Sequence, residues 1–175
     1  MKRGWGWIIG VGLVVGCTSV FAETGKAVIQ GTSAGSKVSG TAKLTDTRQG
    51  LKVVVNVAGV PPGKHGLHIH EKGECGDQGK AAGGHFNPAG APHGYLPKDG
   101  PAKAHAGDMG NLEVGPDGTG VATVLLPGVS LKETGSAPSV SGRAIIVHEK
   151  VDDFGQPTGN AGGRIGCGVI ETTKE

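Results

Sequence analysis

The chain has 175 residues, and 35 of them are glycine, against roughly 7% glycine in ordinary proteins. These glycines follow no Gly-X-Y period and form no low-complexity tract, so the composition excludes a collagen-like or simply disordered chain and favours an all-β protein with many turns. Without residues 1–22, whose only charged residues are Lys2 and Arg3, the 17 basic and 15 acidic residues become 15 of each, and this balance makes nucleic acid an unexpected partner.

Residues 1–22 have the pattern of an export signal. The two basic residues precede an apolar stretch from Trp5 to Val15, and Val20-Phe21-Ala22 then resembles a signal-peptidase site. The apolar stretch is shorter than the roughly 20 residues that a membrane span needs. We therefore expect a signal peptide over residues 1–22, a mature domain over residues 23–175, and export to the periplasm.

The cysteines fit an exported protein and leave one alternative open. Val14-Val15-Gly16-Cys17 resembles a lipoprotein signal that ends before Cys17, in which case Cys17 carries a lipid and the protein contacts the outer membrane. Without such lipidation we expect no membrane contact. The remaining two cysteines, Cys75 and Cys167, most simply form one disulfide in an oxidising compartment.

Seven segments alternate polar and apolar residues as half-buried strands do. They are Lys26–Gln30, Lys37–Thr45, Leu51–Val57, Gly66–His70, Gly120–Leu126, Arg143–His148 and Cys167–Glu171. Turn sequences lie between some of them, at Pro61-Pro62-Gly63 and Pro116-Asp117-Gly118. Because no stretch has a helical period, the pattern predicts an antiparallel sandwich or barrel.

Two segments, residues 71–110 and 149–166, have no strand pattern. The first is rich in glycine, proline and histidine. Loops of this length in a compact domain are usually functional or disordered, and the histidines favour function.

The first candidate metal ligands lie on a predicted strand. Residues two apart on a strand share a face, so His68 and His70 should point away from the core that Leu67 and Ile69 enter. Two imidazoles on a rigid strand form half of a metal site. His148, at the end of another predicted strand, is a candidate to complete it, and a site with only nitrogen ligands favours redox-active copper.

A second set of candidate ligands lies in the first long loop. His85, His93, His105 and Asp108 have the side chains of a three-histidine, one-aspartate zinc site, and irregular loop spacing allows them to converge. His65 has the opposite strand parity to His68 and His70. We therefore expect His65 to be a structural hydrogen-bonding residue.

Four motifs together resemble the copper/zinc superoxide dismutase family in its exported bacterial branch. They are Gly66-Leu67-His68-Ile69-His70, Gly84-His85-Phe86-Asn87-Pro88, His105-Ala106-Gly107-Asp108 and the stretch from Gly159 to Ile170. The resemblance runs from Lys26 to Glu171. It implies an eight-stranded antiparallel Greek-key β-barrel, or flattened sandwich, with a long metal-binding loop and a second active-site loop.

The resemblance also implies the ligands of two metals, copper and zinc, one of each per subunit. Copper would be held by His68, His70, His85 and His148, and zinc by His85, His93, His105 and Asp108. His85 is then shared as a bridging imidazolate.

Further residues match the family's active site. Asp152 resembles the carboxylate that links His68 to His93. Arg164 matches the active-site arginine, with Thr158 as its neighbour in the channel, and Cys75–Cys167 matches the intrasubunit disulfide.

The implied activity is the dismutation of superoxide to dioxygen and hydrogen peroxide, as antioxidant defence outside the cytoplasm. Copper would cycle between Cu(II) and Cu(I), zinc would be structural, His85 would supply a proton and Arg164 would guide the anion. The alternative is a non-catalytic periplasmic copper/zinc buffer or chaperone of the same fold, which has no use for Arg164. The family implies a monomer or a homodimer.

Overall fold

The computed structural model describes Met1 and residues 22–173, so the predictions of a signal peptide and of lipidation at Cys17 lie outside the described residues. The described part contains nine strands and two single helical turns. The strands are β1 (Thr24–Gly31), β2 (Ser39–Thr47), β3 (Gly50–Ala58), β4 (Gly63–His70), β5 (Asp108–Val114), β6 (Gly120–Leu126), β7 (Ala144–His148), β8 (Arg164–Val169) and β9 (Glu171–Thr173). The helical turns are η1 (Lys80–Ala82) and α1 (Leu96–Asp99). No helix among the described residues is long and apolar enough to cross a membrane.

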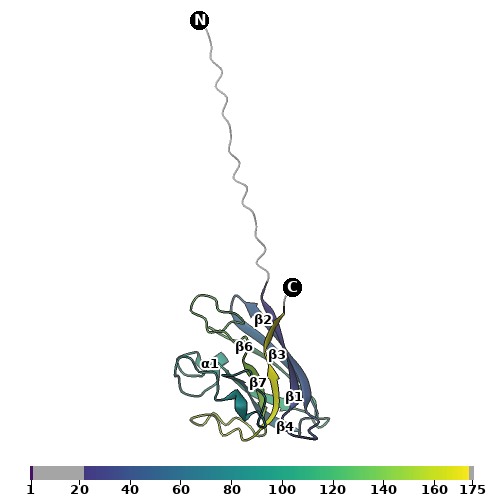
Figure 1. The fold of residues 1–175 in the computed structure, drawn as a ribbon. Coiled ribbons are helices and arrows are strands. Elements are labelled where there is room, and N and C mark those ends of the chain that lie inside the picture. Colours follow the sequence, from purple (N-terminus) through teal and green to yellow (C-terminus); the bar gives the residue numbers. More distant parts are fainter. Residues whose placement is uncertain (2–21, 174–175) are drawn as a thin grey trace.

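The strands form a closed antiparallel barrel (Figure 1). Their order is β2-β3-β6-β5-β4-β7-β8-β1, with β9 added beside β1, and a pairing of β1 with β2 closes the barrel. Strands β4, β5 and β6 follow one another, while β3 lies next to β6, which is a Greek-key arrangement. The predicted eight-stranded Greek-key barrel is confirmed, with β9 as an additional strand.

The core of the barrel forms because apolar residues alternate with polar ones along the strands. In β3, Leu51, Val53, Val55 and Val57 are buried, whereas Lys52 is exposed. Leu67 and Ile69 of β4 are fully buried in the same core. With aromatic residues at only 3% of the chain, aliphatic side chains supply nearly all of this apolar burial.

Strands β5 and β8 differ from the sequence-based prediction. Strand β5 was not expected, because Asp108, Gly110 and Asn111 break the alternation that marks a strand, and Gly110 has a φ of 82°. Strand β8 begins at Arg164, inside the segment predicted to be irregular up to residue 166. Pairing with β7 extends this strand over a glycine-rich sequence with little strand propensity of its own.

Two long loops cover one side of the barrel, while the start of β1 and the end of β9 lie together at one end of it (Figure 1). The loop over residues 71–107 follows β4, and the loop over residues 149–163 follows β7. Both bond to β4: Gly107 accepts a hydrogen bond from Ile69 N–H at 2.9 Å, and Lys150 accepts one from Gly66 N–H at 2.8 Å. The loops therefore close over the outward face of β4.

Candidate metal centre

Strand β4 presents His68 and His70 to the space beneath the two loops. Leu67 and Ile69 enter the barrel core, so the intervening histidines face outward from the barrel, as predicted. The loops nevertheless bury them, leaving 0% of His68 and 1% of His70 exposed. Strand β4 thus fixes the backbone of both histidines, and their imidazole rings lie in an environment from which water is excluded.

The first group of ligand atoms comes from His68, His70, His85 and His148. His148 ends β7, which pairs with β4, and its Nε2 lies 3.3 Å from Nε2 of His70. The ring of His85 stacks on that of His68 with centroids 4.0 Å apart. All four side chains are buried, so two paired strands and one loop hold the group.

The second group comes from His85, His93, His105 and Asp108. Asp108 is the first residue of β5 and not a loop residue. Its carboxylate is fixed by hydrogen bonds from the N–H groups of Gly94 and His105, both at 2.9 Å. Its Oδ1 lies 3.0 Å from Nδ1 of His85 and 3.2 Å from Nδ1 of His105, and its Oδ2 lies 2.9 Å from Nδ1 of His93. His85 therefore belongs to both groups.

The spacing of the donor atoms fits bound metal ions. Four ligands in a tetrahedron around zinc lie about 3.3 Å apart, close to the spacings of the second group. Nδ1 of His68 and Nδ1 of His93 are buried without a hydrogen-bond partner among the described residues. The 2.9 Å contact of His93 Nδ1 with Asp108 therefore lacks hydrogen-bond geometry, as expected for two donors that share an ion. Buried polar atoms without partners are unfavourable, and bound metals would satisfy both.

Asp152 connects the two groups, because its carboxylate contacts one histidine of each. Its carboxylate accepts hydrogen bonds from His68 Nε2 at 2.8 Å and from His93 Nε2 at 3.0 Å. Asn111, which the sequence analysis missed, holds the backbone of Asp152, donating to its carbonyl at 2.9 Å and accepting from its N–H at 2.8 Å. Such contacts orient ligand rings and set which nitrogen faces the metal.

Burial keeps three histidines of the first group neutral. It lowers the pKa of His70 to about 2, that of His148 to about 3 and that of His85 to about 4, because an imidazolium loses hydration when buried. Neighbouring histidines lower these pKa values further. At neutral pH these rings are therefore unprotonated, the form that binds metals.

The carboxylates of Asp108 and Asp152 make the surroundings of His93 charged, unlike the neutral histidines of the first group. Burial opposes the charged form of His93, but its close contacts with the carboxylates of Asp108 and Asp152 outweigh it and raise its pKa to about 9. Burial also opposes the ionised forms of Asp108 and Asp152, yet their histidine contacts hold both carboxyl pKa values well below the usual range. Without metal, His93 is thus a cation between two anions.

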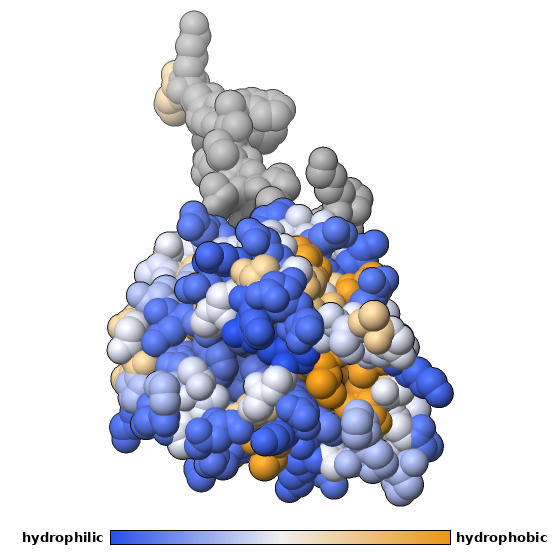
Figure 2. Space-filling view, turned by 60° about the horizontal axis from the view of Figure 1, so that its bottom comes forward, coloured by the Kyte–Doolittle hydropathy of each residue, from blue (hydrophilic) through white to orange (hydrophobic). Residues whose placement is uncertain are grey.

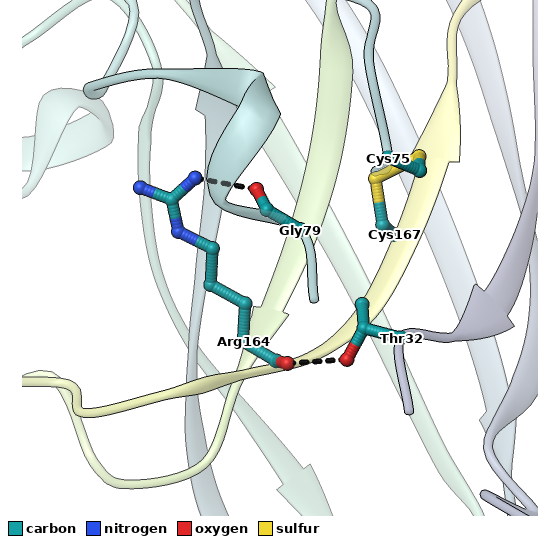
Figure 3. Close-up of a disulfide and its surroundings, with 5 residues drawn as sticks. All are labelled: Thr32, Cys75, Gly79, Arg164 and Cys167. Atoms are coloured by element: carbon teal, nitrogen blue, oxygen red, sulfur yellow. Dashed lines mark hydrogen bonds between the residues drawn. A yellow bond between two sulfur atoms is a disulfide. The ribbon is translucent and has the colours of Figure 1, made fainter. Parts of the chain in front are cut away.

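Arg164 lies at the edge of the first group and is held by the loop that the disulfide anchors (Figure 3). Its guanidinium donates to the carbonyls of Gly79 at 2.6 Å and Gly83 at 2.5 Å, and Gly83 O also accepts from His70 Nδ1 at 3.0 Å. On its other side, Thr32 Oγ1 donates to the Arg164 carbonyl at 2.5 Å. The position of Arg164 therefore depends on the loop over residues 71–107.

The predicted disulfide is confirmed. Cys75 and Cys167 are bonded, with Cα atoms 5.7 Å apart and 92 positions apart in the sequence. The bond ties the loop that holds Gly79 and Gly83 to strand β8, three residues beyond Arg164.

Two other residues singled out in the sequence, His65 and Thr158, lie outside both groups of ligands. His65 belongs to neither group: its Nδ1 contacts the carbonyl of His148 at 2.9 Å and its Nε2 that of Pro61 at 2.8 Å, so it joins backbone segments, as predicted. Thr158 is exposed, and its role in the channel stays a prediction. Gly159, the first residue of the last family motif, has a role that only the structure reveals. A Cβ there would lie 1.9 Å from Asp152 Oδ1, so only glycine leaves room for that carboxylate.

The face shown in Figure 2, in which the bottom of the view in Figure 1 is turned forward, is largely hydrophilic at its centre, with apolar surface gathered in smaller areas. The large apolar side chains exposed in the second loop are Val151 and Phe154, at 45% and 43%. A largely polar surface suits a small charged ligand better than a large apolar one.

Comparisons with known proteins agree on one family. The model of the family described as copper/zinc superoxide dismutase matches residues 38–170. A protein of Aquifex aeolicus (strain VF5) named "Superoxide dismutase (Cu-Zn) 2" is 39% identical over 175 residues, which cover 97% of this chain and 99% of that protein. A Caenorhabditis elegans protein named "Extracellular superoxide dismutase (Cu-Zn)" is also 39% identical, over 80% of this chain and 64% of its own length.

A solved structure supports the same fold. The crystal structure of the clock protein EA4 superposes with a TM-score of 0.75 and 32% sequence identity, covering 89% of this chain and 98% of that one.

Proposed function

The chain belongs to the copper/zinc superoxide dismutase family, and on that premise we propose which residues carry its activity. The protein is a superoxide dismutase with copper and zinc as cofactors: it converts two superoxide ions and two protons into dioxygen and hydrogen peroxide. We assign copper to His68, His70, His85 and His148, and zinc to His85, His93, His105 and Asp108. The observation that carries the assignment is the membership of His85 in both groups.

When bound, copper supplies one-electron chemistry between Cu(II) and Cu(I), while zinc is redox-inert. The protein contributes the environment for this chemistry. Strands β4 and β7 fix the backbones of His68, His70 and His148. Burial keeps the rings of His70 and His148 neutral, and Asp152 fixes the ring of His68 through its Nε2. The imidazoles are therefore positioned before any metal arrives.

Arg164 is the residue that receives the substrate. Superoxide is a small anion with little to recognise besides its charge, and a guanidinium stays ionised at neutral pH. Although burial lowers the pKa of Arg164, it remains charged, and the carbonyls of Gly79 and Gly83 hold it beside His70. A local positive charge is needed because the mature chain has no net charge to attract an anion.

His85 is the residue that handles a proton. Its Nδ1 faces Asp108 and His105 in the zinc group, and we assign its other ring nitrogen to the copper group. That nitrogen holds and delivers one of the two protons that the reaction consumes. In the metal-free protein, burial lowers the pKa of His85, because a protonated ring is unfavourable in this buried position.

The experiment compares metal-loaded and metal-free protein. We expect the disulfide-bonded protein loaded with copper and zinc to scavenge superoxide, and the chelated form to be inactive. A fully loaded, oxidised sample without activity would overturn the assignment and favour a metal buffer or chaperone of the same fold. That alternative leaves the position of Arg164 beside His70 without a purpose.

We also propose that the protein acts outside the cytoplasm, in the periplasm. The export pattern of residues 1–22 and the disulfide support this, because such bonds persist in oxidising compartments. Mass spectrometry of the mature protein tests it. A terminus at Glu23 indicates signal cleavage after Ala22, a lipid on Cys17 indicates an outer-membrane lipoprotein, and an intact Met1 contradicts export.

A further inference from the structure

Gln156, in the loop over residues 149–163, is hydrogen-bonded to the backbone of a proposed zinc ligand. Its Oε1 accepts from the N–H of His93 at 3.0 Å, and its Nε2 donates to the carbonyl of His93 at 2.8 Å. Both distances are those of good hydrogen bonds. Among the described residues, these are the partners of the two backbone groups of His93, which lies in no strand or helix. The side-chain amide of Gln156 thus bonds both backbone groups of His93, as the backbone of a neighbouring strand would.

Phe154 covers the ring of the same histidine. The two rings stack with centroids 6.4 Å apart and an interplanar angle of 20°, and the ring of Tyr95 lies 6.1 Å from that of Phe154. Phe154 has a φ of 60°, a left-handed conformation that a bulky residue adopts only where its surroundings hold it. In this conformation its N–H also donates to Asp152 Oδ1 at 2.8 Å.

Three alternate residues of one loop therefore converge on His93. Asp152 contacts its Nε2, Phe154 its ring face, and Gln156 its backbone. We propose that Gln156 and Phe154 are positioning residues that hold His93 in its zinc-binding orientation and thereby slow the release of zinc.

This proposal rests on the assignment of His93 to zinc and goes beyond it. Among the described residues, the hydrogen-bond and ring partners of the three unshared copper ligands, His68, His70 and His148, do not include Gln156 or Phe154. Loss of either side chain should therefore affect zinc and leave copper in place. A general loosening of the fold would release both metals.

The decisive variant is Gln156→Leu, which keeps a similar volume but removes both hydrogen bonds. We expect zinc to leave the copper- and zinc-loaded protein about tenfold faster, as the loss of two ordinary hydrogen bonds predicts, measured by transfer to a chromophoric chelator. Phe154→Ala should speed release several-fold. Val151→Ala, an exposed apolar residue of the same loop, is the matched control and should release zinc at the wild-type rate.

Two further readouts separate positioning from general destabilisation. Copper release should be unchanged in Gln156→Leu, and hydrogen exchange at the backbone N–H of His93 should accelerate, because that group loses its acceptor. Equal zinc release in Gln156→Leu and Val151→Ala would overturn the proposal while leaving the zinc assignment intact. Equal acceleration of copper and zinc release would also overturn it. A wild-type protein that holds no zinc would instead overturn the assignment on which the proposal rests.

Discussion

The carboxylate of Asp152 provides the sharpest test of how the two sites are joined, through the substitution Asp152→Asn. The side chain is buried, with 1% exposed, and it accepts from His68 and His93. Replacing a charged acceptor by a neutral one weakens the one hydrogen bond that remains by about 1 kcal/mol. An asparagine also has one acceptor oxygen, so its NH2 group faces one of the two ring N–H groups. That unsatisfied contact costs about a further 1–3 kcal/mol.

The sum is about 3 kcal/mol, which corresponds to roughly a 100-fold loss of metal affinity. We expect the remaining oxygen to stay with His68, whose contact is shorter at 2.8 Å against 3.0 Å for His93. Zinc affinity should therefore fall more than copper affinity. Competition against a chelator of known affinity measures both constants.

The adjacent acid supplies the control. Asp153 is exposed and bonds to Asn160 and Gly155 N–H, away from the histidines, so Asp153→Asn should leave both affinities unchanged. If the Asp152 and Asp153 variants bind zinc equally well, the link through Asp152 does not orient His93 and the reasoning is wrong.

Three further predictions concern the guide residue, the disulfide and acidity. Arg164→Ala should lower the superoxide reaction rate at least tenfold with both metals retained, measured by pulse radiolysis and metal analysis; loss of copper would show instead that Arg164 is structural. Cys75→Ser should lower the free energy of unfolding by about 4 kcal/mol. In the loaded protein it should also reduce activity, because the carbonyl of Gly79 no longer fixes Arg164. Unchanged activity at full metal loading would refute the dependence of Arg164 on the disulfide. The metal-free protein should lose stability as the pH falls below about 6.5 and through the lowered pKa values of His148 and His85, about 3 and 4, since the unfolded chain then binds protons that the folded one excludes. Each such group contributes up to about 1.4 kcal/mol per pH unit, and urea unfolding that is independent of pH between 7 and 4 would contradict these shifts.

Much of the candidate site could be predicted because its residue types are unusual and strand geometry is simple. The two-residue period of a strand placed His68 and His70 on one face opposite Leu67 and Ile69, and the structure has this arrangement. The opposite parity of His65 likewise separated it from the ligands. Local sequence did not order the strands around the barrel; that expectation came from the family resemblance.

The missed features depend on contacts between distant segments. Strand β5 has polar residues and glycine where a strand pattern needs apolar ones, and its pairing with β4 outweighs that local sequence. Gln156 and Asn111 are ordinary amides with no distinguishing signal in the chain. Their roles follow from the backbone groups that folding brings near them, His93 and Asp152 respectively.

The central claim is that one histidine, His85, joins two metal sites, and the spectrum of bound copper tests it most directly. Zinc should be removed selectively from the loaded protein while copper stays bound, and the electron paramagnetic resonance of Cu(II) recorded before and after. A shared imidazole predicts a clear change in the copper signal, reversed when zinc is added back. A copper signal that is identical with and without zinc would contradict the shared ligand.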